Sequence, residues 1–429
     1  MSNSNSNSHE VVILGGNFGG VNAVHHLLRQ TLPQLHQLDQ SKSYHVTLVT
    51  PNTSFFFKIA SPRALVNSTL IPHEKIFRPL SEAFSKYDSS QFELIQGVAS
   101  ALDPAQRTVT VSIGDDTGIT QQLHYDSLII ISTGTTSRSP LWTLHNDQSL
   151  TEKALNSLHA ALPNAKTVLI SGGGAVGVET AGEIASNFPS SKVTLLSGAN
   201  RLLSRVKQGT SARAQDYLEN IMRVEVINHV RVESTNPTEP GASPTMVKLS
   251  DGSSREVDIY IDATGGIPNS EFLSKSWLDE TGRVITSDAY FRVKGSGSDD
   301  VKGVYVLGDL VAGSSNSALE LDAMVTTLCS SLAVDIAGNL GIKRPEEPAP
   351  GLLSSAWRLI LGSSGNGYPV QQEFKPMKET IFVPIGNGGG VGQVFGWRVP
   401  SLLVKFGKAK SFLIELVGPT ISGEKWKKA

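Results

Sequence analysis

Cysteine is almost absent from this chain: Cys329 is the single cysteine among 429 residues. One cysteine can form neither a disulfide within the chain nor a C-x-x-C pair, which excludes an internal dithiol relay. Cys329 lies in LDAMVTTLCSSLAVDI, an apolar run typical of a buried helix. We therefore expect it to be a small core residue.

Long apolar runs and an excess of charge are also absent. No stretch reaches the roughly 18 apolar residues of a membrane span, and residues 1–8 form a polar tail that we expect to be disordered. That tail has neither the apolar core of a signal peptide nor the Gly after Met1 that N-myristoylation requires. A net charge of −2 gives no basic field for nucleic acid. We expect a cytoplasmic protein, in contact with a membrane at most peripherally, with no metal site.

Glycine, by contrast, is plentiful, and it gathers in two similar segments. EVVILGGNFGGVNAVHHLL begins at Glu10 and KTVLISGGGAVGVETAGEI begins at Lys166. Each joins a β-rich run to a helical pattern through a glycine turn, and each is followed by a short strand, over 45–50 and 192–197. This pattern predicts two βαβ dinucleotide-binding units.

The second glycine turn has the complete fingerprint spacing, Gly172, Gly174 and Gly177. The first glycine permits the tight turn, the second lets backbone approach a pyrophosphate, and the third lets helix and strand pack closely. The helix N-terminus then offers N–H groups to the phosphates. We interpret this turn as a nucleotide-binding loop.

The first turn departs from the fingerprint at its middle position. It runs Gly15, Gly16, Asn17, Phe18, Gly19, Gly20. Asparagine tolerates left-handed backbone better than most residues, so the turn can form. We expect the Asn17 side chain to crowd a pyrophosphate or to hydrogen-bond to it.

Neither unit has the acid that normally binds ribose hydroxyls at the end of the second strand. Thr50 stands there in the first unit and Ser197 in the second. Thr50 can still hydrogen-bond a ribose. At Ser197 nothing repels a 2′-phosphate, and Arg201 and Arg205 follow closely, so we predict that NADPH is accepted.

Three further strands end in characteristic turns, at Thr133-Gly134, Thr264-Gly265 and Gly308-Asp309. Together with the glycine turns, these resemble the two-dinucleotide-binding-domain flavoproteins. The stretches VVILGGNFGG, FFFKIASPRALV, ATGGIPN, VYVLGD and GGGVGQVFG resemble the branch of apoptosis-inducing factor and the ferroptosis suppressor protein.

The resemblance implies an α/β fold: two Rossmann-like domains of glutathione-reductase-like architecture plus a C-terminal α+β region. It implies FAD in the first unit and NAD(P)H in the second. The FAD-binding domain is expected in two parts, residues 9–145 and 266–340. The NAD(P)H-binding domain is expected at 146–265 and the C-terminal region at 341–429.

The resemblance also implies roles for single residues. The loop Gly15 to Gly20 would hold the FAD pyrophosphate, with Thr50, Thr133 and Gly134 beside the cofactor. Arg63 would touch FAD, the Val98 backbone would meet the adenine, and Asp309 would contact the ribityl or pyrophosphate region. Lys58 would lie near the flavin, and Glu179 near flavin and nicotinamide.

Plainer interpretations of four residues stay open. Arg63 would then be a surface arginine and Lys58 a solvated lysine. Glu179 would be an ordinary acid in the first turn of a helix, where the helix dipole favours negative charge. Asp309 would be a helix N-cap.

These features predict an FAD-dependent oxidoreductase that passes hydride from NAD(P)H to the flavin and electrons to a quinone or other small-molecule acceptor. The alternatives are a flavoenzyme with a specialised small-molecule substrate and a slow redox-sensing flavoprotein. In each case we expect a monomer or a homodimer. Residues 401–429 mix apolar residues with lysines. They are interpreted either as an amphipathic element on an anionic membrane or as a packing helix with a solvated lysine face.

Overall fold

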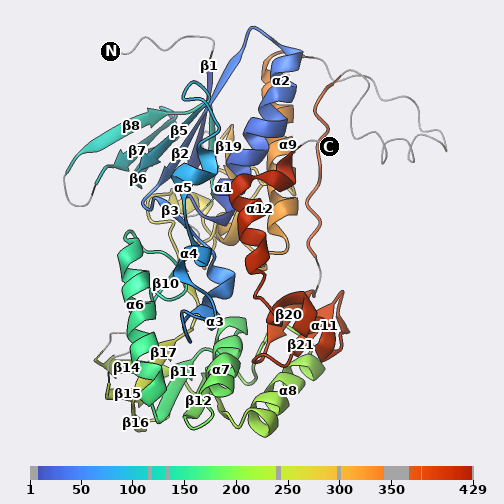
Figure 1. Cartoon of the computed structure of the whole chain (residues 1–429). Helices are drawn as coiled ribbons and strands as arrows, with labels where there is room; N and C mark the ends of the chain where they lie inside the picture. Colours follow the sequence, from blue (N-terminus) through green and yellow to red (C-terminus); the bar gives the residue numbers. More distant parts are fainter. Residues whose placement is uncertain are drawn as a thin grey trace, which may run out of the picture.

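The first of two parallel sheets takes strands from distant parts of the chain (Figure 1). The computed structural model describes residues 8–114, 118–131, 135–237, 243–296, 301–342, 367–377 and 379–427. The sheet has the order β19-β9-β1-β2-β5 with every pair parallel. Its strands are β1 (Ser8–Leu14), β2 (Ser43–Thr50), β5 (Phe92–Gln96), β9 (Ser127–Ile130) and β19 (Val304–Val306). The strands β1 and β9 are central and read as continuous apolar runs because helices and loops cover both faces.

The second parallel sheet is built entirely between residues 167 and 262. It has the order β13-β12-β11-β17, from β11 (Thr167–Ser171), β12 (Lys192–Ser197), β13 (Glu225–Asn228) and β17 (Ile259–Asp262). Helix α7 (Ala175–Asn187) is the crossover from β11 to β12. Two Rossmann-like units are thus present, as predicted, and the domain boundaries given above stay a prediction.

Helix α9 (Leu321–Asn339) lies against α1 (Phe18–His26) and α2 (Leu32–Leu38) on the first sheet. Its length and composition would suffice to cross a membrane, yet 56% of the apolar window is buried within the protein. Cys329 is fully buried in this helix, which confirms its prediction as a core residue. We therefore describe α9 as a core helix.

Smaller antiparallel sheets of two or three strands and further helices complete the two units. The strands are β3 (Ser54–Phe56), β4 (Phe77–Pro79), β6 (Val98–Asp103), β7 (Thr108–Ser112), β8 (Thr120–His124), β10 (Thr135–Ser137), β14 (Val232–Asn236), β15 (Thr245–Leu249), β16 (Ser254–Val257) and β18 (Gly266–Pro268). The helices are α3 (Ser61–Ala64), α4 (His73–Ile76), α5 (Leu80–Phe84), α6 (Gln148–Ala161) and α8 (Gln208–Asp216).

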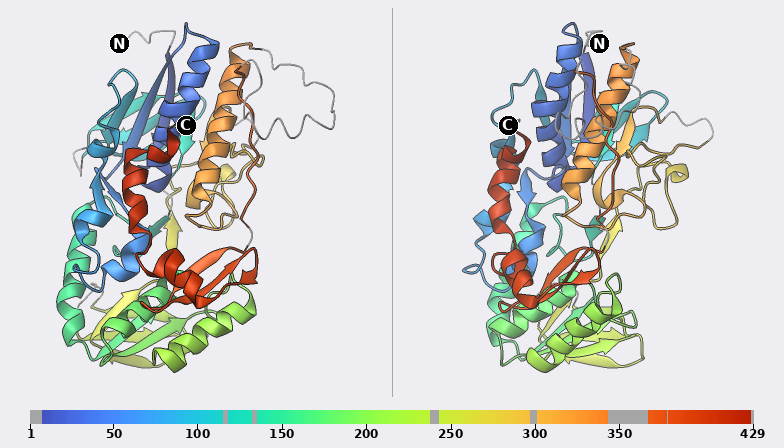
Figure 2. Two further views of the ribbon diagram at one scale, coloured as in Figure 1. Left: turned by 45° about the vertical axis from the view of Figure 1, so that its right-hand side comes forward. Right: turned by 90° about the vertical axis from the view of Figure 1, so that its right-hand side faces the viewer.

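The C-terminal region reaches both units (Figure 2). The strand β20 (Ile381–Pro384) packs against α7 and β21 (Gly390–Val394) against α8, while β22 (Trp397–Arg398) and α11 (Ser401–Val404) pack on β21. Helix α12 (Val417–Ser422) then runs along α1 and α5. Residues 401–427 therefore do not form one continuous helix. A π-turn follows α11, and Phe412 and Leu413 have positive φ, which breaks the segment into short pieces.

Candidate functional site

The first glycine turn is packed so closely that Gly16, Gly19 and Gly20 leave no room for a side chain. A methyl group on Gly16 would lie 2.7 Å from Thr50, and one on Gly20 would lie 1.8 Å from the Gly15 carbonyl oxygen. Gly15 has φ +113°, a backbone conformation that glycine adopts without strain. Gly19 is pressed against Ile131, with a methyl group there only 2.2 Å from it. The turn therefore leads directly from β1 into the N-terminus of α1, the end of a helix that is suited to bind an anion.

Asn17 makes a hydrogen bond that the sequence did not suggest. Its side-chain oxygen accepts a 3.4 Å hydrogen bond from the Phe56 backbone N–H in β3, and its contact with a pyrophosphate stays a prediction. Asn17 is the N-cap residue of α1 and makes no capping hydrogen bond from its side chain. Phe18, the first residue of α1, packs its ring 4.9 Å from that of Phe55. The departure from glycine thus ties the loop to β3 and leaves the helix N-terminus open.

The end of β2 lies directly beside this loop. Thr50 is buried, and its hydroxyl donates to the Asn52 carbonyl at 3.3 Å. The Gly97 N–H donates to the Thr50 carbonyl at 2.9 Å, which places half-buried Val98 next to the strand end. Thr50 and Val98 therefore lie together at the end of β2, and their contact with an adenosine stays a prediction.

Lys58 and Asp309 meet although 251 residues separate them. The Lys58 Nζ lies 3.2 Å from Asp309 Oδ2, and the two side chains are 37% and 27% exposed. Asp309 lies inside a 3₁₀ turn, Gly308–Leu310, so it is not a helix N-cap. Thr133 and Gly134 lie outside the described residues. The pair brings the FFFKIASPRALV and VYVLGD stretches to one side of the first sheet.

The second glycine turn repeats the geometry of the first. Gly172 has φ +121°, and a methyl group on Gly177 would lie 1.8 Å from the Gly172 carbonyl oxygen. Gly173 faces Ser197 as Gly16 faces Thr50. A methyl group added to Gly173 would lie 2.5 Å from the Ser197 hydroxyl oxygen. A methyl group on Gly174 would meet nothing within 4 Å. The open space at Gly174 is what close approach of a pyrophosphate needs.

Helix α7 carries two buried acids that face cations from elsewhere in the chain. Glu183 accepts two 2.8 Å hydrogen bonds from Arg63, and both side chains are buried, so Arg63 is not a surface arginine. Glu179 accepts a 2.6 Å hydrogen bond from the Lys408 Nζ. Burial raises the pKa of Glu179, and Lys408 opposes that rise. Glu179 is therefore no ordinary solvated acid of a first helical turn.

Three of these groups escaped the sequence analysis. Glu183 follows Glu179 by four residues and so lies on the same helix face, a spacing that could have revealed it. Lys408 gave no signal, since its partner lies 229 residues away. The Phe412 ring lies 4.6 Å from the Arg63 guanidinium and 5.7 Å from the Lys408 Nζ. The C-terminal region thus contributes directly to the junction of α3 and α7.

The tail of the chain is held on α1 and does not project outward. The Trp426 indole N–H donates to Asn22 at 2.9 Å, and His25 bonds the Ile421 carbonyl at 2.9 Å. Trp426 is only 7% exposed. The segment from Ile421 to Trp426 therefore packs against the protein, and membrane contact by the C-terminal region stays a prediction.

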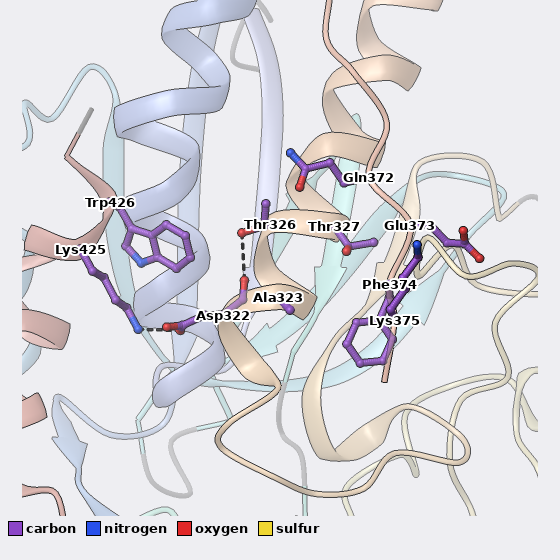
Figure 3. A pocket seen from close by; sticks show the side chains of 10 residues that line it. All are labelled: Asp322, Ala323, Thr326, Thr327, Gln372, Glu373, Phe374, Lys375, Lys425 and Trp426. Carbon is purple, nitrogen blue, oxygen red and sulfur yellow. Dashed lines mark hydrogen bonds and ion pairs between the residues drawn. The ribbon is translucent and has the colours of Figure 1, made fainter. Parts of the chain in front are cut away.

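An open cleft of about 440 Å³ lies between α9 and the tail (Figure 3). Trp426 and the Lys425–Asp322 ion pair lie on one side, and Phe374 and Lys375 on the other. Among the described residues, no group of histidines, cysteines and acids is arranged to hold a metal ion.

Comparison with known proteins decides the family. The model of the pyridine nucleotide-disulphide oxidoreductases matches residues 9–325. The chain belongs to this family. It is 30% identical to oxidoreductase phnG of Penicillium herquei, covering 97% of both chains. It is 24% identical to ferroptosis suppressor protein 1 of Taeniopygia guttata, covering 94% of this chain and 93% of that one.

Among solved structures, NDH2 from Plasmodium falciparum in complex with NADH has a TM-score of 0.59 at 16% identity, covering 98% of this chain and 100% of that one. These matches confirm the predicted resemblance and fold. Membership of this oxidoreductase family makes FAD and NAD(P)H the cofactors. The first loop fits FAD, since its glycines leave no room for side chains and the N-terminus of α1 is uncapped by a side chain.

Proposed function

We propose that this flavoprotein is an NAD(P)H:quinone oxidoreductase that works without a redox disulfide. The observation that carries the proposal is the lone Cys329, buried in α9, whose thiol pKa is raised by burial. No second thiol exists in the chain to relay electrons. The acceptor must therefore meet the flavin directly, and the resemblance to the ferroptosis suppressor branch favours a quinone. The overall reaction is NAD(P)H + H⁺ + quinone → NAD(P)⁺ + quinol.

The chain's own residues supply binding and charge. Bound FAD supplies hydride acceptance and electron donation. Lys58, held by Asp309, offers positive charge near the expected flavin position and offsets negative charge there. Glu179, which is buried, and Lys408, which is partly exposed, form an ion pair that places a carboxylate and an ammonium group side by side at α7.

We further propose that residues 395–406, the C-terminal hairpin, contact the cytoplasmic surface of a membrane, where a lipid quinone resides. Five apolar side chains between residues 395 and 406 are more than half exposed: Phe395 69%, Trp397 80%, Leu402 61%, Leu403 53% and Phe406 65%. Arg398 and Lys410 are exposed nearby. Aromatic and leucine side chains flanked by cations suit an anionic interface.

The reaction is tested on purified holoprotein under anaerobic conditions. NADPH or NADH should bleach the flavin band, and a soluble ubiquinone analogue should restore it rapidly. Flavin that bleaches but does not recover with quinone would reject the quinone as acceptor. Lys58→Met should shift the flavin reduction potential, and an unchanged potential and turnover would remove Lys58 from the proposal.

Membrane contact is tested by liposome flotation. The variant Phe395→Ser/Trp397→Ser/Phe406→Ser should lose most of its binding to vesicles containing anionic lipid. Ile119→Ser/Ile221→Ser, at two sites that are 60% exposed, is the matched control and should float like the unchanged protein. Equal flotation of both variants would reject the hairpin as the contact.

A specialised small-molecule substrate is the second candidate. The cleft of Figure 3 favours it, because charged side chains line both of its sides, among them Asp322, Lys425, Glu373 and Lys375. Such a lining suits a polar molecule better than an isoprenoid quinone. Reoxidation by polar substrates but not by quinones, abolished by Lys375→Ala, would favour this alternative.

A further inference from the structure

The C-terminal end of β12 is bordered by an arginine that the glycine pattern did not suggest. Arg231 directly precedes β14, and its side chain lies across the backbone of Gly198. A methyl group on Gly198 would lie 2.6 Å from Arg231 Nε and 2.7 Å from its Cγ. Glycine at position 198 is thus what allows the guanidinium to occupy this place.

The backbone around Arg231 is fixed by hydrogen bonds to β12 and to a neighbouring turn. The Val230 N–H donates to the Ser197 carbonyl at 3.1 Å. The Arg231 N–H donates to the Ser250 hydroxyl at 3.0 Å, and the Ser250 N–H returns a 2.9 Å bond to the Arg231 carbonyl. The position of Arg231 beside Gly198 is therefore built into the sheet edge.

The Arg231 guanidinium is available for a ligand. It is exposed, and within the described part of the chain no hydrogen bond or ion pair joins it to another group. The two arginines suggested by the sequence are engaged instead. Arg201 donates to the carbonyls of Val206 and Ser204, at 2.9 and 2.7 Å, and Arg205 donates to the Ser315 carbonyl at 3.1 Å.

We propose that Arg231 binds the 2′-phosphate of NADPH and makes NADPH the preferred electron donor. In a Rossmann-like unit the adenosine ribose lies at the end of the second strand, here Ser197. Ser197 is buried, and its hydroxyl lies 3.3 Å from the Ala199 N–H and within reach of nearby carbonyls, so no carboxylate there binds a ribose diol or repels a phosphate. The planar guanidinium fork matches phosphate oxygens. The inference rests on nucleotide binding in the second unit and is independent of the electron acceptor.

The test uses a fragment that lacks nicotinamide. Calorimetric binding of 2′,5′-ADP and of 5′-ADP to the purified holoprotein isolates the 2′-phosphate. Arg231→Gln should weaken the binding of 2′,5′-ADP by about tenfold or more, since a charge-assisted contact is lost, and should leave the binding of 5′-ADP unchanged. Steady-state kinetics should show a matching rise in KM for NADPH at unchanged KM for NADH.

Two further variants separate recognition from structure. Arg205→Gln is the matched control and should leave both affinities unchanged. Arg231→Lys keeps the charge without the fork and should lose only part of the discrimination. Equal binding of both nucleotides by the unchanged protein, or equal weakening of both by Arg231→Gln, would overturn the assignment. Quinone turnover plays no part in the calorimetric outcome, so failure here is distinct from failure of the proposed reaction.

Discussion

The two glycine turns are built alike, but the strand ends beside them differ. In both turns the last glycine, Gly20 or Gly177, packs against the carbonyl oxygen of the first. The glycine after the first faces a hydroxyl residue, so that Gly16 faces Thr50 and Gly173 faces Ser197. Beyond Thr50, Asn52 donates from its side chain to the His145 carbonyl and closes the strand end with neutral groups. Beyond Ser197, Gly198 leaves room for Arg231. The shared part has the geometry expected of a pyrophosphate-binding turn, and the strand ends are where we expect the two units to differ in the adenosine that they accept.

The helices that follow the turns differ as well. Helix α1 presents His25 and His26, buried and in contact with the chain's tail. Helix α7 presents Glu179 and Glu183, buried against Lys408 and Arg63. The same βαβ scaffold therefore uses neutral contacts in one unit and ion pairs in the other.

The largest loss of stability should come from breaking the buried ion pair between Arg63 in α3 and Glu183 in α7. Glu183→Ala leaves the Arg63 guanidinium buried without its carboxylate, which should lower the free energy of unfolding by about 3–5 kcal/mol. Urea denaturation measures this loss. The double variant Arg63→Met/Glu183→Leu should recover much of it, and a double variant as unstable as the single one would contradict this account.

The next largest loss of stability should come from variants that distort one glycine turn at a time. Gly20→Ala and Gly177→Ala each push a methyl group against a backbone carbonyl, at a cost of about 3 kcal/mol. Gly20→Ala should lower the FAD content of purified protein. Gly177→Ala should retain FAD but lose its reduction by NADPH. If both variants lost FAD equally, the two turns would not serve separate nucleotides.

Acid should weaken the first unit through its histidines. Burial is the first cause that lowers the pKa of His25 to about 3 and of His26 to about 4, so the unfolded chain binds more protons below pH 6.5. The contribution of the two neutral histidines to the free energy of unfolding is fully present above about pH 6.5. It falls as the pH drops toward 4, by up to about 1.4 kcal/mol per pH unit for each histidine. Urea midpoints from pH 7.5 to 4.5 measure this slope, and His25→Asn should flatten it. An unchanged slope would assign the acid sensitivity to other groups.

The smallest effect concerns Asn17. Asn17→Gly removes only the long hydrogen bond to Phe56, so stability should change by about 0.5 kcal/mol or less and FAD should stay bound. The reciprocal variant, Gly174→Asn, should leave stability unchanged because an added Cβ meets nothing within 4 Å, but should weaken NADPH binding. Loss of FAD from Asn17→Gly would show that the asparagine contacts the cofactor after all. Thermal unfolding and flavin absorbance measure both variants.

The sequence by itself determined the two units, their glycine turns and the absence of a thiol pair. Those features are local or countable: strand, turn and helix follow one another within about 30 residues, and the spacing of the glycines carries the geometry. Three residue placements were beyond it. Asn17 bonds to β3, Trp426 packs on α1, and Arg231 lies beside Gly198 at the end of β12. Each depends on segments that only folding brings together.

The tertiary structure alone decided how the C-terminal region joins the site. Lys408 reaches Glu179 across 229 residues, and Lys58 reaches Asp309 across 251. Helical spacing could relate Glu183 to Glu179, but no periodicity relates a cation in one element to an acid in another. Such pairs form because burying a carboxylate requires a partner, and the packing of α3, α7 and the C-terminal region determines which cation is near enough.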